Sequence, residues 1–234
     1  MTETRVEAIY ARLKEMTVDF RIRPGERLNE VTLARDLNAS RTPLREALNR
    51  LVAEQLVTLQ PGAGFWCRKL DADTIFQLYE LREVLEVASV RRACERASET
   101  DIAALHDQLH ADGLGYVGKT VRQVTAQDEA FHIGIARSSG NAELVRQLTG
   151  VNERIRYIRW VDMADRVATT RDEHRAIMAA LMARNADAAE HLMRGHIVKR
   201  MDQVTAAVRI GFSNIYMPGH EVLFDRPLQE TPDD

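Results

Sequence analysis

LARDLNASRTPLREALNR, residues 33–50, is typical of two short helices joined by a tight turn. Asn38 stands at the turn, where the chain needs a residue that tolerates the left-handed backbone conformation. Ser40 or Thr42 can cap the second helix. Pro43 suits its first turn, because the N–H that proline lacks would have no intrahelical partner there. The stretch therefore predicts a helix-turn-helix.

The second of these helices has an apolar side and a polar end. Four apolar residues recur at helical spacing and define the buried side: Leu44, Ala47, Leu48 and Leu51. This spacing leaves Ser40, Arg41, Thr42 and Arg45 at or beside the exposed N-terminal end. That end of a recognition helix enters the DNA major groove. Taken alone, the pattern fits an ordinary amphipathic helix pair with solvated arginines equally well.

The next stretch, LVTLQPGAGFWCRKL at residues 56–70, shifts the balance towards DNA binding. Residues 57–59 and 65–68 have the composition of two short strands around a Pro-Gly-Ala-Gly turn. Gly62 lies in that turn, where a wing tip near the minor groove leaves no room for a side chain and favours positive φ. A helix-turn-helix followed by a hairpin is a winged helix, so residues 1–70 are predicted to form a winged helix-turn-helix DNA-binding domain.

Composition and charge fit a protein that touches nucleic acid with one end only. The 234-residue chain is 45% hydrophobic with a net charge of −3, and residues 1–70 hold 12 Lys and Arg against 9 Asp and Glu. A mildly basic head thus precedes an acidic body. Two cysteines, no signal peptide and no long apolar run predict a reduced, soluble, cytoplasmic protein that does not enter a membrane.

The remaining chain shows helical periodicity and no strand pattern. Six helices are expected, at about 71–97, 100–111, 119–138, 141–164, 166–183 and 185–210, with glycines such as Gly113, Gly115 and Gly140 between some of them. The fold class is therefore mainly α, a winged helix-turn-helix followed by an all-helical antiparallel bundle at 71–210. Residues 211–234 are expected to form an irregular C-terminal tail.

Residues 23–57, RPGERLNEVTLARDLNASRTPLREALNRLVAEQLV, resemble the DNA-binding half of the GntR family of bacterial transcription regulators. Asn38 and Gln55 stand where that family usually has glycine. Four later segments resemble the helical FCD domain of its FadR-like subfamily: ELREVLEVASVRRACERA at 80–97, DEAFHIGIARSSGN at 128–141, RIRYIR at 154–159 and EHRAIMAALMARNADAAEHLMRGHI at 173–197. The resemblance implies a dimeric repressor or activator that responds to a small effector; a repressor that binds a palindromic double-stranded DNA operator is the expected form.

Asp128 and His132 are four residues apart on one predicted helix, so their side chains project from one face and can chelate one ion. The pair alone fits a polar surface face better. The resemblance adds His174 and His196, because metal-binding members of the subfamily carry an Asp-x-x-Phe-His motif and one histidine on each of two later helices. One carboxylate and three imidazoles suit a divalent ion such as Zn, Ni or Mn.

Arg82 and Arg154 are the predicted effector-binding residues. The resembling subfamily carries an arginine at the position of Arg82 on its first bundle helix, and the arginine fork matches the carboxylate of a small organic acid. Most arginines are simply solvated or paired with a nearby glutamate, which here would be Glu83, Glu86 or Glu153. Two other functions compete with an effector-controlled regulator. One is a metal-dependent helical-bundle enzyme, although only one Glu-x-x-His motif occurs and no hydrolase or phosphate-binding motif is present. The other is a regulator whose metal is purely structural.

Overall fold

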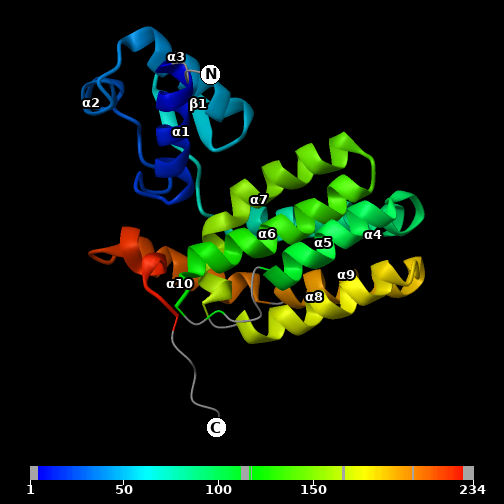
Figure 1. Ribbon diagram of the computed structural model, residues 1–234. Coiled ribbons are helices and arrows are strands. Elements are labelled where there is room, and N and C mark those ends of the chain that lie inside the picture. Colours follow the sequence, from blue (N-terminus) through cyan, green and yellow to red (C-terminus); the bar gives the residue numbers. More distant parts are fainter. Residues whose placement is uncertain (1–4, 112–115, 117, 165–166, 202, 229–234) are drawn as a thin grey trace. The chain divides into compact units, whose positions relative to one another are not determined.

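The computed structural model describes residues 5–111, 116, 118–164, 167–201 and 203–228 (Figure 1). The chain divides into two compact units, residues 1–71 with 212–221 and residues 72–211 with 222–234. No helix in the described ranges is both long and apolar enough to cross a membrane.

The first unit contains a helix-turn-helix and a two-stranded wing. Its elements are α1 (Arg5–Val18), α2 (Glu30–Asp36), α3 (Arg41–Ala53), β1 (Val57–Gln60) and β2 (Gly64–Cys67). The strands are antiparallel, with Val57 opposite Cys67. The segment before α2 joins them through an antiparallel bridge between Arg27 and Trp66. The predicted winged helix-turn-helix is thereby confirmed.

Two corners of this unit have left-handed backbone conformations. Asn38 has a φ of 47° in the turn between α2 and α3, and Gln55 has a φ of 60° between α3 and β1. Asparagine adopts this conformation with little strain, whereas glutamine costs about 1–2 kcal/mol there. Both are the positions where the resembling family usually has glycine, and the backbone conformation explains that preference.

The second unit is an antiparallel helical bundle. Its main helices are α4 (Ala72–Arg96), α5 (Glu99–Ala111), α6 (Val121–Ser138), α7 (Ala142–Met163), α8 (Val167–Met182) and α9 (Ala186–Met201). The N-terminal caps of α6 and α7 are side chains that accept backbone N–H groups, Thr120 within a capping box and Asn141 at two positions. A core of buried side chains from α4, α5, α6, α8 and α9 holds the bundle together.

The end of the bundle differs from the expectation. The single helix expected at 185–210 is two helices, α9 and α10 (Val204–Ile215), and a 3₁₀ helix η1 (His220–Asp225) follows where an irregular tail was expected from residue 211. Gly211 lies inside α10. A Cβ at this position would approach Ile158 Cδ1 of α7 at 3.1 Å, so the absence of a side chain allows the two helices to pack closely. Its role is close helix packing and not helix termination. Gly113, Gly115 and residues 229–234 lie outside the described residues.

Candidate metal centre and nucleic-acid interface

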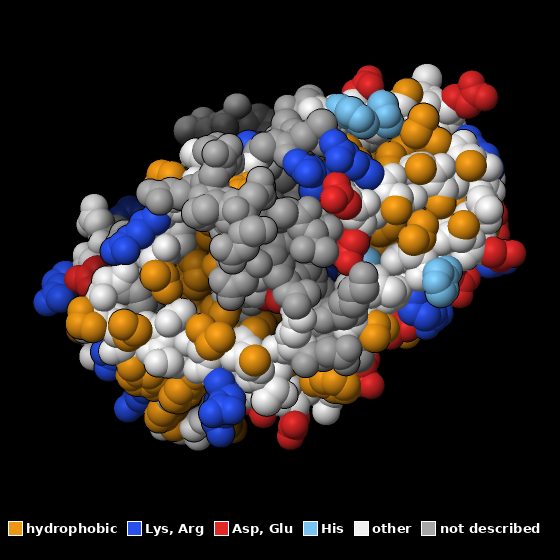
Figure 2. All heavy atoms as spheres, turned by 90° about the horizontal axis from the view of Figure 1, so that it is seen from below, with side chains coloured by type: hydrophobic (Ala, Val, Ile, Leu, Met, Phe, Trp, Pro, Cys, Tyr) orange, Lys and Arg blue, Asp and Glu red, His pale blue; other side chains and the backbone are white. Residues whose placement is uncertain are grey.

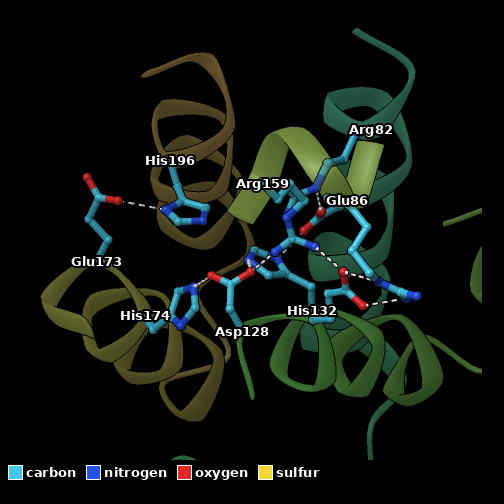
Figure 3. A network of polar contacts seen from close by, with 10 residues as sticks. Arg82, Glu86, Asp128, His132, Arg159, Glu173, His174 and His196 are labelled. Carbon is cyan, nitrogen blue, oxygen red and sulfur yellow. Dashed lines mark hydrogen bonds and ion pairs between the residues drawn. The ribbon is translucent and has the colours of Figure 1, made fainter. Parts of the chain in front are cut away.

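Four polar side chains from three helices meet inside the bundle (Figure 3). Asp128 and His132 lie one turn apart on α6, His174 comes from α8 and His196 from α9. All four are buried, and one ligand atom from each lies within 4.8 Å of the others. The structure thus brings together the four residues that the sequence analysis proposed as ligands.

Carboxylates outside this cluster orient two of the imidazoles. Glu86 of α4 pairs with His132 Nδ1, and Glu173 of α8 accepts a hydrogen bond from His196 Nδ1 at 2.7 Å. Donation from Nδ1 leaves Nε2 as the lone-pair nitrogen, the tautomer that carboxylate partners impose on metal-ligating histidines. His174 lies with its ring stacked on Phe131, 4.4 Å between centroids, and its Nε2 3.3 Å from Asp128 Oδ1.

The hydrogen bonding of the histidine nitrogens shows whether these residues fit a metal ion. Within the described part of the chain, the buried His132 Nε2 has no hydrogen-bond partner and lies 3.8 Å from Asp128 Oδ2, while the buried His174 Nε2 has the Asp128 Oδ1 contact at 3.3 Å. A buried polar atom without a partner is costly, and a cation among these nitrogens would satisfy them. The residues present therefore fit a divalent metal ion.

The protonation states of Asp128, His132 and His196 are those of metal ligands. Burial raises the pKa of Asp128, but Arg159, His132 and His174 together outweigh it and hold that pKa well below its usual range. Glu86 behaves similarly, with burial opposed by Arg82 and a pKa of about 2. Burial lowers the pKa of His132, and it lowers that of His196 to about 3. At neutral pH the carboxylates are charged and these imidazoles are neutral, the forms that bind metal.

Arg159 is a residue of this centre that the sequence analysis missed. It is buried on α7, forms an ion pair with Asp128 Oδ2, and lies 3.1 Å from Glu129 Oε1. The RIRYIR stretch offers three arginines, and only the packing of α7 against α6 shows which one is buried. Glu173 was missed for the same reason, because no sequence pattern ties it to His196.

The two arginines predicted to bind an effector have different surroundings. Arg82 is buried on α4, with its Nε 2.5 Å from Glu86 Oε1. It helps to line a cavity of about 10 Å³, together with Tyr79, Asp128, Arg159, Asp162, Met163 and His196. Arg154 is half-buried on α7 and is not among the described residues that line this cavity. A space of this volume holds about one water molecule.

Other histidines lie apart from the centre. His110 and His191 are exposed, His106 is partly exposed, and pale-blue histidine side chains are visible on the surface in Figure 2. The side chain of His220 lies outside the described residues.

The predicted DNA-reading residues lie at the polar end of α3 and in the wing. Ser40 precedes α3 as its N-cap without forming a side-chain capping bond, and Ser40, Arg41 and Thr42 are exposed. Arg45 is partly exposed one turn further along, and the opposite side of α3 is buried as the periodicity predicted. Gly62 has a φ of 74°, with open space where a Cβ would stand.

A winged helix-turn-helix with an exposed recognition helix, joined to a separate helical domain with a buried polar centre, is the architecture of a DNA-binding regulator with a second domain. Residues 5–66 match the family described as bacterial regulatory proteins, gntR family, and residues 77–199 match the FCD domain. The chain belongs to the GntR family of bacterial regulatory proteins and carries an FCD domain. It is a transcriptional regulator and not an enzyme.

Relatives agree with this assignment. The Nta operon transcriptional regulator of Aminobacter aminovorans is 41% identical over 86% of this chain and 95% of its own length. The transcriptional repressor RspR of Escherichia coli is 26% identical over 85% of this chain and 88% of its own. The solved structure of E. coli McbR/YncC has a TM-score of 0.66 at 21% identity, covers 88% of this chain and 99% of that one, and supports the fold alone.

Proposed function

We propose that this regulator is a homodimeric repressor whose affinity for a palindromic operator is controlled by a small organic acid bound beside a divalent ion. In this proposal residues 1–70 bind DNA and residues 71–210 bind the metal and the effector. The observation that carries the proposal is the convergence of four buried ligand atoms within 4.8 Å, next to the buried guanidinium groups of Arg82 and Arg159.

Asp128, His132, His174 and His196 would hold the ion. One carboxylate and three neutral imidazoles suit Zn, Ni or Mn and leave coordination positions for an anionic ligand. When bound, the ion supplies a Lewis-acidic centre that attracts the oxygen of a carboxylate. The ligands come from α6, α8 and α9, so the ion also ties the packing of three helices together.

The charges around the centre favour an acid as effector. Asp128 and Glu86 carry two negative charges, and Arg82 and Arg159 carry two positive ones. Glu173 beside His196 adds a further carboxylate, and Glu129 is paired with Arg156 as well as Arg159. A divalent ion adds two positive charges to this buried set, and a carboxylate effector would offset part of the excess. Arg159 is better placed than Arg154 to bind it, because it lines the cavity beside Asp128. The role of Arg154 stays a prediction.

The DNA-binding part of the proposal depends on two copies of α3. One recognition helix reads only a few base pairs, and a two-fold dimer doubles these contacts on a palindrome. Arg41 and Arg45 would contact base edges in the major groove. Ser40 and Thr42 would contact the end of the operator half-site or its phosphates, and Gly62 would bring the wing tip close to the minor groove.

The proposal is tested by metal analysis combined with an operator-binding titration in the presence of a panel of small organic acids. The wild-type protein should contain metal and change its operator affinity with one acid. His174→Ala should lose both the metal and the response to the acid, because it removes a ligand. Arg82→Lys should keep the metal and lose the response, because lysine keeps the charge beside Glu86 but lacks the fork.

Three results would count against this function. A metal-free protein that still responds to its acid would remove the ion from the mechanism. A metal that raises thermal stability while no acid alters operator affinity would make the ion a structural link among α6, α8 and α9. Elution as a monomer at micromolar concentration, with and without operator, would exclude the dimer.

A further inference from the structure

Arg45 of the recognition helix does not extend freely into solvent. Its Nη1 lies 3.2 Å and 3.1 Å from the two carboxylate oxygens of Glu30, the first residue of α2. Its guanidinium carbon also lies 5.3 Å from the centre of the Phe65 ring, which is fully buried in β2. Two neighbouring elements therefore constrain one arginine of α3.

The position of Glu30 is itself fixed by the backbone. Leu28 N donates to Phe65 O at 2.8 Å, which joins the chain before α2 to the wing. Asn29 then caps α2 by accepting the backbone N–H groups of Val31 and Thr32. The carboxylate one residue further on is thus held by both the wing and the helix start, and it stands beside Arg45 before any DNA arrives.

Contact through Nη1 leaves the remaining donors of the guanidinium for another partner. Guanine presents O6 and N7 in the major groove, a pair of acceptors that a guanidinium reads bidentately when its plane is already set. A long side chain held in one orientation loses less conformational entropy on binding than a free one. The carboxylate carries a penalty as well, because it repels the DNA phosphates.

We infer that Glu30 is a positioning residue for DNA reading: it holds the guanidinium of Arg45 in the orientation that distinguishes the correct base, at some expense of general affinity for DNA. The inference rests on the proposed role of Arg45 in the major groove. Glu30 would therefore determine specificity without touching a base.

The test compares Glu30→Gln with Glu46→Gln in the full-length protein. Both variants lose one negative charge on the helix-turn-helix. Glu46 is exposed and adjacent to Arg45 on α3, and helical neighbours one residue apart do not face each other. The probes are a duplex selected by the wild-type protein from a randomised pool and a scrambled duplex of equal length. The readout is the specificity ratio, the dissociation constant for the scrambled duplex divided by that for the selected duplex.

Both variants should bind the scrambled duplex somewhat more tightly than wild type, because a like charge is removed. Only Glu30→Gln should lower the specificity ratio, by about tenfold per half-site, since a bidentate base contact accounts for roughly fivefold to a hundredfold discrimination. The loss should be confined to substitutions of one base pair in each half-site. In an Arg45→Ala background, Glu30→Gln should change the ratio no further.

The outcomes separate this inference from the proposed function. If Arg45→Ala leaves the specificity ratio unchanged, the proposed role of Arg45 fails and the inference fails with it. If Arg45→Ala lowers the ratio and Glu30→Gln does not, the inference alone is overturned. A Glu30→Gln variant with a raised ratio would show that the carboxylate restrains Arg45 from DNA and would also overturn it. Thermal unfolding of each variant shows whether the fold is intact.

Discussion

Replacing Glu173 with glutamine should weaken metal binding while leaving every proposed ligand in place. The Glu173 carboxylate accepts the Nδ1–H of His196 at 2.7 Å, which is within the short range of charge-assisted hydrogen bonds. An amide oxygen can still accept this bond, so the tautomer is retained and only the charge is lost. Outer carboxylates of this kind contribute tenfold to 100-fold in affinity, and we expect a loss of about tenfold, or about 1.4 kcal/mol, at the lower limit.

The assay is competition between the protein and a chromophoric chelator for Zn²⁺ at pH 7.5. Glu190→Gln on α9 is the matched control, because it removes the same charge from a glutamate that pairs with Arg91 and Arg194 instead of a ligand. Glu173→Ala should lose more affinity than Glu173→Gln, since no acceptor remains for His196. Equal zinc affinity in wild type, Glu173→Gln and Glu173→Ala would refute the argument that this carboxylate orients the imidazole.

Four further predictions concern acid stability, DNA binding and helix packing. Burial holds the folded-state pKa of His196 at about 3, below an unfolded value of about 6.5, so the metal-free protein should lose stability as pH falls through that window; urea unfolding at several pH values should show a smaller loss for His196→Gln. Arg41→Ala should weaken operator binding by about 1–3 kcal/mol per half-site if a bidentate base contact is lost, measured by fluorescence anisotropy against the scrambled duplex. Gly62→Val should reduce operator affinity, because a φ of 74° disfavours a β-branched residue and a side chain at the wing tip would meet the DNA. Bundle stability should not change, because nothing within the protein lies within 4 Å of the added Cβ; unchanged affinity would argue against a wing contact. Gly134→Val should destabilise the bundle by about 1–3 kcal/mol in thermal unfolding, because even a Cβ would approach Leu105 Cδ1 at 2.5 Å.

The winged helix was predictable because local chemistry marks most of its turns, the exception being Gln55 between α3 and β1. Asn29 and Asn38 are residues that cap helices or tolerate left-handed backbone, and the Pro-Gly-Ala-Gly turn separates the strands. The break between α9 and α10 has no such mark, since neither glycine nor proline lies near residue 202 and the apolar periodicity continues past it. Gly211 misled the prediction because glycine serves close packing as well as helix ends.

The four inner residues of the candidate centre were predictable, but only Asp128 and His132 from the sequence pattern itself, since His174 and His196 came from the family resemblance. Asp128 and His132 share a helix face by spacing, whereas their meeting with His174 and His196 depends on how α6, α8 and α9 pack. Arg159 is one of several arginines on α7, and its burial follows from tertiary packing that no local pattern encodes. That these residues bind metal and acid stays a prediction.

The small cavity beside the centre affects the rate of ligand exchange as well as the affinity. A space of about 10 Å³ admits neither an ion with its water shell nor an organic acid unless the side chains or helices around it first move apart. Under the proposed function, exchange is then set by how often the bundle opens locally, a process that takes microseconds to seconds in folded proteins. A regulator built in this way would keep its ligand through brief changes in supply and would respond to the concentration averaged over many openings.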